Sequence, residues 1–321
     1  MSKIIDLSDQ KIKLLLKRLE KVKNNIDKII KEIAATSETS NVFWSAINVR
    51  LRKEYEAARN ITRDWINKNV PDIYAEQLKD ELVRIKNMRL PAPKRINYKD
   101  FAATHTFTQS SASLLSETLS TFAIGFNSGE KTLLRLASLT QQVNLSEKAV
   151  EKAITEGFIE KGSIYGSKKR LQKELLKKSL DGKYITVVNK NGKETQWQIK
   201  TYSELVAKTK LHEASTQGVI DSAMAVGGDL VQVSSHNTNT AYDAQFEGKI
   251  FSLSGSSKQF PVATDLPPFH PNCWHTISIV FRESLAQQGT LADYISFSNG
   301  ESEIHPTRKS FIPLSKREFA A

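Results

Sequence analysis

The sequence of 321 residues contains a single cysteine, Cys273. One cysteine cannot form a disulfide bond within the chain, so no disulfide framework supports the fold. No apolar run of signal-peptide length follows the first residues, and no run reaches the roughly 18 apolar residues that a membrane-spanning helix needs. We therefore expect a protein that is made in a reducing cytoplasm and has no transmembrane helix.

Signatures of common enzymes are also missing from the sequence. There is no Walker A loop, no Gly-x-Gly-x-x-Gly after a strand pattern, no Gly-x-Ser-x-Gly and no His-Glu-x-x-His. Nor is there a winged-helix, zinc-finger or basic-zipper pattern, each of which would predict sequence-specific DNA binding. These absences favour a protein that is not an enzyme.

The formal net charge is +11, and most of it lies in the first hundred residues. That segment contains 22 Lys and Arg against 14 Asp and Glu, which is a net charge of +8. Because the basic residues are interspersed with acidic ones, the pattern favours a diffuse attraction to packed polyanion over groove reading. A solvated helix face is the alternative explanation of the same pattern.

Three helices are predicted in the first ninety residues. An apolar heptad seam, with alternating steps of three and four, runs through the first helix at Ile12, Leu15, Leu19, Val22, Ile26, Ile29 and Ile33. A second helix, from Phe43 to Trp65, is expected to fold back on the first as an antiparallel hairpin. A third helix is expected to start at Pro71, because proline suits the first turn of a helix.

The next ninety residues are predicted to form a connector and further helices. A helix around Leu114 to Phe126 is expected to break at residues 127–131. Asn144 and Glu147 have the spacing of a capping box, which predicts a new helix start.

From residue 183 the hydrophobic period changes to that of strands. Asn191 and Gly192 lie between β-branched and aromatic residues, which predicts a β-hairpin. A helix over residues 201–228 follows. Three more strands are then predicted, over residues 229–235, 248–255 and 274–282.

These patterns predict an α+β fold. An elongated, mostly α-helical N-terminal region, built as a helical hairpin or bundle, precedes a small C-terminal mixed α/β module. The predicted division is a basic helical arm over residues 1–90, a helical region over 91–182, the mixed α/β module over 183–284 and a polar C-terminal tail over 285–321.

Histidines flank the only cysteine, in the stretch LPPFHPNCWHTISIVF at residues 266–281. His270, Cys273 and His275 form a His-x-x-Cys-x-His group before a predicted strand, and His236 follows another one. Imidazole and thiolate groups are good zinc ligands, and four of them would close a tetrahedral structural site. These four residues are therefore the candidate ligands of a structural zinc ion.

Three other interpretations of this stretch stay open. In the first, the prolines set an extended turn, Cys273 is buried as a small apolar residue, and the histidines bind backbone carbonyls. In the second, a Cys-His pair acts as a nucleophile, although no oxyanion donor or orienting Asp is evident. The third is a metal-dependent nuclease using His236 and Asp243, which would need clustered carboxylates where only Asp229, Asp243 and Glu247 are near.

Two ordered motifs carry a resemblance to a known family. The first consists of Phe246, Gly248, Lys249, Ile250, Phe251, Ser252, Ser254 and Gly255, and the second of Pro267, Pro268, His270, Pro271, Asn272, Cys273 and His275. Together they resemble the C-terminal module of tailed-phage minor capsid proteins, the minor capsid protein 2 group, related to head-morphogenesis proteins of Mu-like and SPP1-like phages. Two positions differ: Trp274 stands where the family usually has arginine, and TNTAYDA replaces a Cys-x-x-Cys of some relatives.

The resemblance implies a structural virion protein, made in the host cytoplasm and located inside the head near the portal. Its implied roles are head assembly and contact with, or delivery of, packaged DNA. The implied partners are the portal protein, the capsid proteins and DNA held by non-specific electrostatics, with no membrane. The heptad seam adds self-association as a candidate contact.

Two other functions are kept as alternatives. One is a zinc-dependent nuclease or toxin-like effector delivered with the genome, which would use His236, His270, Cys273 and His275. The other is a scaffold-like chaperone of head assembly that is lost on maturation.

Overall fold

The structure is a computed structural model, and the chain divides into two compact units. One unit contains residues 1–9, 68–116 and 207–321, and the other contains residues 10–67 and 117–206. The residues that the structure describes are 2–87, 105–155, 172–173, 175–177, 181–188, 191–236, 238, 240–287, 290–303 and 306.

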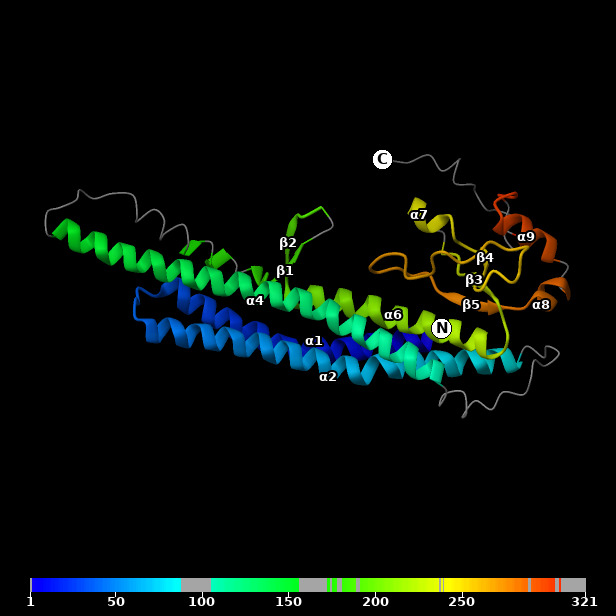
Figure 1. Ribbon diagram of the computed structural model, residues 1–321, viewed down its shortest axis with the longest axis horizontal. Coiled ribbons are helices and arrows are strands. Elements are labelled where there is room, and N and C mark those ends of the chain that lie inside the picture. Colours follow the sequence, from blue (N-terminus) through cyan, green and yellow to red (C-terminus); the bar gives the residue numbers. More distant parts are fainter. Residues whose placement is uncertain are drawn as a thin grey trace. The chain divides into compact units, whose positions relative to one another are not determined.

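Long helices dominate the N-terminal part of the chain, and short strands and helices dominate the C-terminal part (Figure 1). The elements are α1 (Ser2–Ala35), α2 (Asn41–Asn87), α4 (His105–Thr155), β1 (Ile185–Val188), β2 (Glu194–Trp197), α6 (Ile199–Ala225), β3 (Leu230–Val233), α7 (Ala241–Ala244), β4 (Ile250–Ser252), β5 (Ile277–Val280), α8 (Arg282–Gln287) and α9 (Leu291–Ser298). This confirms the predicted α+β fold class.

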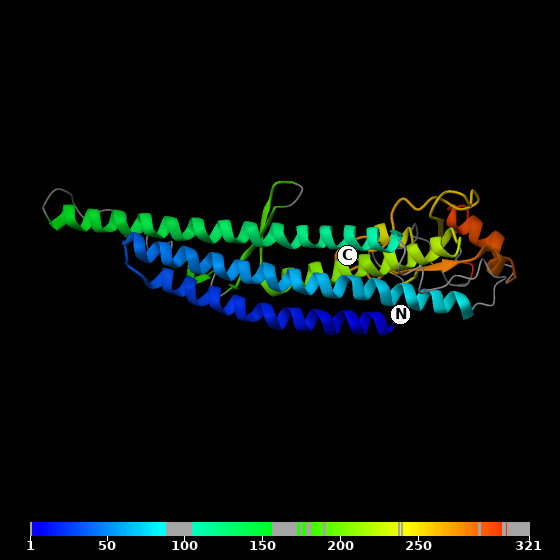
Figure 2. The same ribbon diagram turned by 60° about the horizontal axis from the view of Figure 1, so that its bottom comes forward.

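The helices α1 and α2 form the predicted antiparallel hairpin (Figure 2). Near one end of the pair, Trp65 Nε1 donates to the carbonyl of Lys11 at 2.9 Å. Near the other end, Arg50 Nη1 lies 2.7 Å from Glu32 Oε2. All seven residues of the heptad seam are buried, so the seam is covered within the chain itself.

The helix α4 packs antiparallel to α2 in the same unit. Arg59 Nη1 lies 2.7 Å from Glu130 Oε2, and Gln141 Nε2 donates to Asn41 Oδ1 at 2.9 Å. Figures 1 and 2 both show the two helices side by side over this stretch. The hairpin and α4 thus form a helical bundle.

Three helix boundaries expected from the sequence are wrong. Pro71 lies inside α2, and both residues 127–131 and Asn144 lie inside α4. A Cβ atom at Gly129 would lie 2.0 Å from the carbonyl oxygen of Tyr184. The glycine therefore allows the chain before β1 to approach α4 closely, and it does not break the helix.

The predicted β-hairpin is confirmed. Strand β1 pairs antiparallel with β2, with Ile185 opposite Trp197 and Val188 opposite Glu194. Between the strands Gly192 has φ of +76°, a left-handed conformation that glycine adopts without strain.

The other three predicted strands form one antiparallel sheet in the order β4-β3-β5, called the C-terminal sheet below. Alternation along the strands gives it two apolar faces. One face packs Val231 and Ile279 with Ala223 of α6. The other packs Leu230 and Ile250 with Phe260, Leu285 of α8 and Tyr294 of α9.

The helices α8 and α9 lie where the polar tail was expected to begin. Tyr294 and Phe297 of α9 are buried, and the Ser298 hydroxyl accepts a hydrogen bond from the Ile250 N–H at 3.0 Å. Residues 282–298 therefore contribute to the core around the C-terminal sheet. The division of the chain into four domains stays a prediction.

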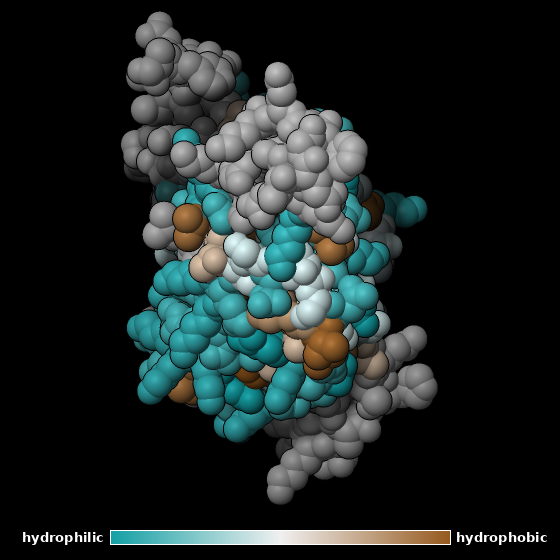
Figure 3. All heavy atoms as spheres, turned by 90° about the vertical axis from the view of Figure 1, so that its left-hand side faces the viewer, coloured by the Kyte–Doolittle hydropathy of each residue, from teal (hydrophilic) through white to brown (hydrophobic). Residues whose placement is uncertain are grey.

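Within the described ranges, none of the helices has the length and apolar character needed to cross a membrane. Among the residues that are coloured in Figure 3, most of those on this face are hydrophilic, with hydrophobic side chains in small groups between them.

Candidate metal centre

The C-terminal sheet brings three segments of the chain together. Val233, the last residue of β3, pairs with Ile277, the first residue of β5, and the Gly248 N–H donates to the Val233 carbonyl at 3.0 Å. Because β4 and β5 both run antiparallel to β3, the residues before them lie beside the residues after β3. The three segments carry His236, Glu247 and His275.

The carboxylate of Glu247 is buried and accepts several hydrogen bonds. His275 Nε2 lies 3.0 Å from Oε1, and the backbone N–H groups of His236 and Thr238 donate to the same oxygen at 3.1 and 2.9 Å. Burial acts to raise the pKa of Glu247, but the hydrogen bonds from His275 and the two N–H groups outweigh it and lower the pKa. Glu247 is therefore ionised at neutral pH.

An ionised Glu247 determines which nitrogen of His275 carries the proton. The carboxylate can only accept, so Nε2 of His275 is the donor, and in the neutral ring Nδ1 carries the lone pair. Nδ1 lies 3.5 Å from Cys273 Sγ and 3.8 Å from Asp243 Oδ2. His275 is 2% exposed, and Cys273 beside it is partly buried.

Asp243 comes from α7, four residues before Glu247, and is also 2% exposed. Its Oδ2 accepts a hydrogen bond from His270 Nε2 at 2.7 Å. Its Oδ1 has no hydrogen-bond partner among the described residues. The site thus contains a buried carboxylate oxygen that the described side chains do not satisfy, which is uncommon in proteins.

His270 is more exposed than Asp243 and His275, and each of its ring nitrogens faces a hydrogen-bond acceptor. Nδ1 lies 2.8 Å from the Pro271 carbonyl oxygen, and Nε2 faces Asp243. The hydrogen bond to Pro271 raises the pKa of His270, burial opposes it, and the bond to Asp243 raises it further. Both nitrogens are therefore placed to donate, which favours the imidazolium form.

A histidine that the sequence analysis did not single out supports the loop. His212 on α6 hydrogen-bonds the backbone at His275 and Cys273, while burial, the largest effect, lowers its pKa. Its Nε2 has no hydrogen-bond partner among the described residues. No pattern around His212 marks it, because it lies in an ordinary helical stretch more than 60 residues from Cys273.

Three side chains could hold a metal ion: Asp243, Cys273 and His275 each offer a donor atom, and these atoms all lie within 4.8 Å of one another. Two of the four predicted ligands, Cys273 and His275, belong to this group. His270 instead hydrogen-bonds Asp243, and His236 pairs through Nε2 with the Ser234 hydroxyl at 2.8 Å. The rings of His236 and His275 are in edge contact, with centroids 5.2 Å apart.

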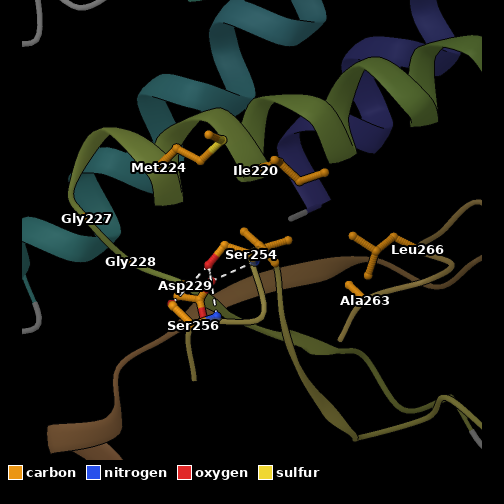
Figure 4. Close-up of a pocket in the computed structure, with 10 residues that line it drawn as sticks. Ile220, Met224, Gly227, Gly228, Asp229, Ser254, Ser256, Ala263 and Leu266 are labelled. Carbon is orange, nitrogen blue, oxygen red and sulfur yellow. Dashed lines mark hydrogen bonds between the residues drawn. The ribbon is translucent and has the colours of Figure 1, made fainter. Parts of the chain in front are cut away.

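A separate pocket of about 460 Å³ lies between α6 and the loop after β4 (Figure 4). Ile220, Met224 and Leu266 supply apolar lining. The carboxylate of Asp229 lies at the pocket but accepts from the Ser254 N–H at 2.8 Å and the Ser254 hydroxyl at 2.6 Å (Figure 4). Asp229 therefore serves to hold the loop, and the pocket offers no group with the chemistry of the histidine cluster.

A comparison with known protein families gives a match that includes the candidate metal centre. The family model described as Phage minor capsid protein 2 matches residues 127–294, which include both the C-terminal sheet and the candidate metal centre. Among curated proteins and solved structures, none matches the chain.

A match over more than half of the chain defines the class of protein: it is a structural component of a phage head. The chain belongs to the phage minor capsid protein 2 family. Virion location and association with other capsid components follow from that family. The link to Mu-like and SPP1-like head-morphogenesis proteins stays a prediction.

Proposed function

We propose that the protein is a non-enzymatic component inside the phage head, close to the portal, where it supports head assembly. In this proposal the portal and capsid proteins are its protein partners. The helical bundle also meets packaged DNA through its positive charge and contributes to the contact with, or delivery of, that DNA. The observation that carries the proposal is the family match, combined with the concentration of charge in the first hundred residues.

The side chains of α1 are arranged in a way that supports contact with a polyanion. Its apolar seam is buried, while its exposed positions are rich in lysine. Among the α1 side chains whose burial the structure describes, the exposed lysines are Lys13, Lys17, Lys21, Lys28 and Lys31. A row of such residues attracts phosphate groups without reading bases, because the attraction depends on charge alone.

Self-association through the heptad seam would require a rearrangement of the bundle. The seam residues, such as Leu15 and Ile26, have no exposed surface to offer a second chain. Contact through the seam therefore needs α1 to be exchanged between two copies. We propose instead that subunit contacts use the outer faces of the helices.

The position of the protein can be tested on purified particles. Cross-linking of mature virions followed by mass spectrometry should join lysines of α1 or α2 to the portal protein or to inner capsid residues. The protein should be present in both proheads and mature particles. Its absence from mature particles would support the assembly-chaperone alternative, and cross-links to outer surface proteins alone would contradict the proposal.

Binding to DNA can be tested with matched charge changes. Replacing Lys13, Lys17 and Lys28 by glutamine should weaken binding to random duplex DNA and reduce its salt dependence, by about 0.9 in the log–log slope for each phosphate that is no longer neutralised. The control replaces three exposed lysines outside the first hundred residues, namely Lys193, Lys200 and Lys258. Equally weakened binding in both triple variants would contradict a role for α1 in particular.

A zinc-dependent nuclease or toxin-like effector is the second candidate function. The observation in its favour is that Asp243, Cys273 and His275 are three donors, and a zinc ion with three protein ligands keeps one position open. We expect purified protein to cleave neither DNA nor RNA with added zinc or magnesium. Cleavage that disappears in Cys273→Ala would favour the nuclease instead.

A further inference from the structure

We propose that Asp243, Cys273 and His275 bind a zinc ion, with Glu247 and His270 as hydrogen-bond partners that orient two of the ligands. This set differs from the four residues expected from the sequence, because Asp243 enters it. The proposed set does not include His236, and it makes His270 a hydrogen-bond partner of Asp243 and not a ligand. The inference concerns the chemistry of these side chains and does not depend on where the protein lies in the virion.

The separations of the donor atoms suit zinc. With a Zn–S bond of about 2.3 Å and a Zn–N bond of about 2.0 Å, a tetrahedral angle places sulfur and nitrogen about 3.5 Å apart. Cys273 Sγ and His275 Nδ1 are 3.5 Å apart. Asp243 Oδ2 lies 3.8 Å from the same nitrogen, and a small rotation of the carboxylate would bring it into the coordination sphere.

The orientation of His275 also suits a metal ligand. A histidine that binds a metal through one nitrogen commonly donates the other N–H to a carboxylate, which holds the ring in place and raises its basicity. Glu247 is that carboxylate, at 3.0 Å from Nε2. The two backbone N–H groups hold the Glu247 carboxylate in place, so Nε2 of His275 stays directed at Glu247 while Nδ1 faces Cys273.

Asp243 provides an observation that is independent of the histidines. Its side chain is nine-tenths or more buried, and its Oδ1 has no hydrogen-bond partner among the described residues. An unsatisfied oxygen of a buried carboxylate is costly, and a cation beside the carboxylate removes that cost. As ligands, a carboxylate and a thiolate are both anionic donors, which suit a divalent cation such as Zn²⁺.

The choice of zinc follows from the donor types. A thiolate, an imidazole and a carboxylate together are typical ligands of zinc, whereas magnesium and calcium prefer oxygen ligands alone. The bound ion would connect α7 to the segment that leads into β5, two pieces of chain that are 30 residues apart in the sequence. We therefore expect it to brace the loops beside the C-terminal sheet.

Cobalt(II) is a suitable probe, because it takes zinc positions and reports thiolate coordination by its absorption spectrum. Cys273 is the only cysteine, so any thiolate-to-cobalt band must come from it. Full-length protein freed of metal should bind one Co²⁺ ion per chain with a thiolate charge-transfer band and tetrahedral ligand-field bands. Added Zn²⁺ should displace Co²⁺ and protect Cys273 from alkylation by iodoacetamide.

Substitutions can distinguish the residues that bind the metal from those that only position the ligands. Cys273→Ser should abolish the charge-transfer band, and Asp243→Asn should weaken zinc binding at least 100-fold. Glu247→Gln should weaken it about 10- to 100-fold, as expected for a positioning residue. His236→Gln is the matched control, since His236 touches the His275 ring but lies outside the donor group. The zinc affinity of this variant should stay within about threefold of wild type.

Several outcomes would overturn the proposal. They include an absence of the charge-transfer band in folded wild-type protein, unchanged zinc affinity in Asp243→Asn, and a reduction in His236→Gln as large as that in Asp243→Asn. Should Cys273→Ser fail to fold, the alkylation test on wild-type protein decides the question. Rapid alkylation that zinc does not slow would then favour the Cys-His nucleophile pair over a metal ligand.

Discussion

Glu81 of α2 accepts a hydrogen bond from the backbone N–H of Ile279, in the middle of β5, at 2.9 Å. Arg84, one helical turn later, pairs with Glu81 and donates to the carbonyl of the same Ile279. Because β5 is an edge strand of the C-terminal sheet, its outward backbone groups would otherwise be unpaired. A helical acid–base pair thus replaces a neighbouring strand at this edge.

Replacing Glu81 by alanine should therefore destabilise the protein. The Ile279 N–H is buried, and leaving such a donor without a partner costs about 1–3 kcal/mol. Urea denaturation followed by tryptophan fluorescence should show a lower midpoint. Glu81→Gln keeps an acceptor and should be less destabilised, and Glu20→Ala on the exposed face of α1 should change little. Equal midpoints for Glu81→Ala and Glu20→Ala would contradict this role.

Gly129→Ala should destabilise the helical bundle even though alanine is the better helix former. The added Cβ would lie 2.0 Å from the Tyr184 carbonyl oxygen, so α4 and the chain before β1 must move apart. We expect stability to fall by about 1–3 kcal/mol, the usual cost of overpacking. Ser128→Ala, at the adjacent position of the same helix, is the control. Stability equal to or above wild type in Gly129→Ala would show that no close approach exists.

Tyr74→Phe should reveal a buried hydrogen bond within the unit that contains the C-terminal sheet. The Tyr74 hydroxyl donates to Asp221, which also accepts from Gln217 Nε2 at 2.9 Å, and both Tyr74 and Asp221 are buried. Removing the donor should cost about 1–3 kcal/mol, because the carboxylate stays buried. Tyr242→Phe removes an exposed hydroxyl–carboxylate contact and should have little effect on thermal stability.

Asp229 should make stability depend on pH. Burial acts to raise its pKa, but hydrogen bonds from Ser252, Ser254 and Ser257 outweigh it and hold the pKa below the ordinary value of 3.8. A carboxyl whose pKa is lower in the folded state stabilises the protein above its unfolded pKa, and this contribution is lost as the pH falls through the folded-state value.

The melting temperature of Asp229→Asn should therefore be lower than that of wild type at pH 7. The difference should shrink once the pH falls below about 4. A difference that stays constant down to acid pH would mean that Asp229 acts through packing and not through its charge. Differential scanning calorimetry at a series of pH values measures this directly.

The hydrophobic period predicted most of the helices and strands, because it reports which side of an element faces the core. The α1 seam and the hairpin turn at Gly192 are determined locally, by residue spacing and by a glycine at positive φ. Helix continuity was harder to predict. Pro71 is tolerated inside α2, where Val70, Ile73 and Tyr74 beside it are fully buried, so tertiary packing outweighs the local preference of proline.

The candidate metal centre, like the fold, could be predicted only in part from the sequence. The sequence by itself determined the chemical types present near residue 273, a thiol between two imidazoles, because these residues are close along the chain. Only the tertiary structure decided which groups face Cys273. The antiparallel sheet places Glu247 against His275, and α7 turns Asp243 inward while His236 bonds to Ser234. These contacts depend on pairing between strands that are far apart in the sequence, and the spacing of residues along the chain does not reveal that pairing.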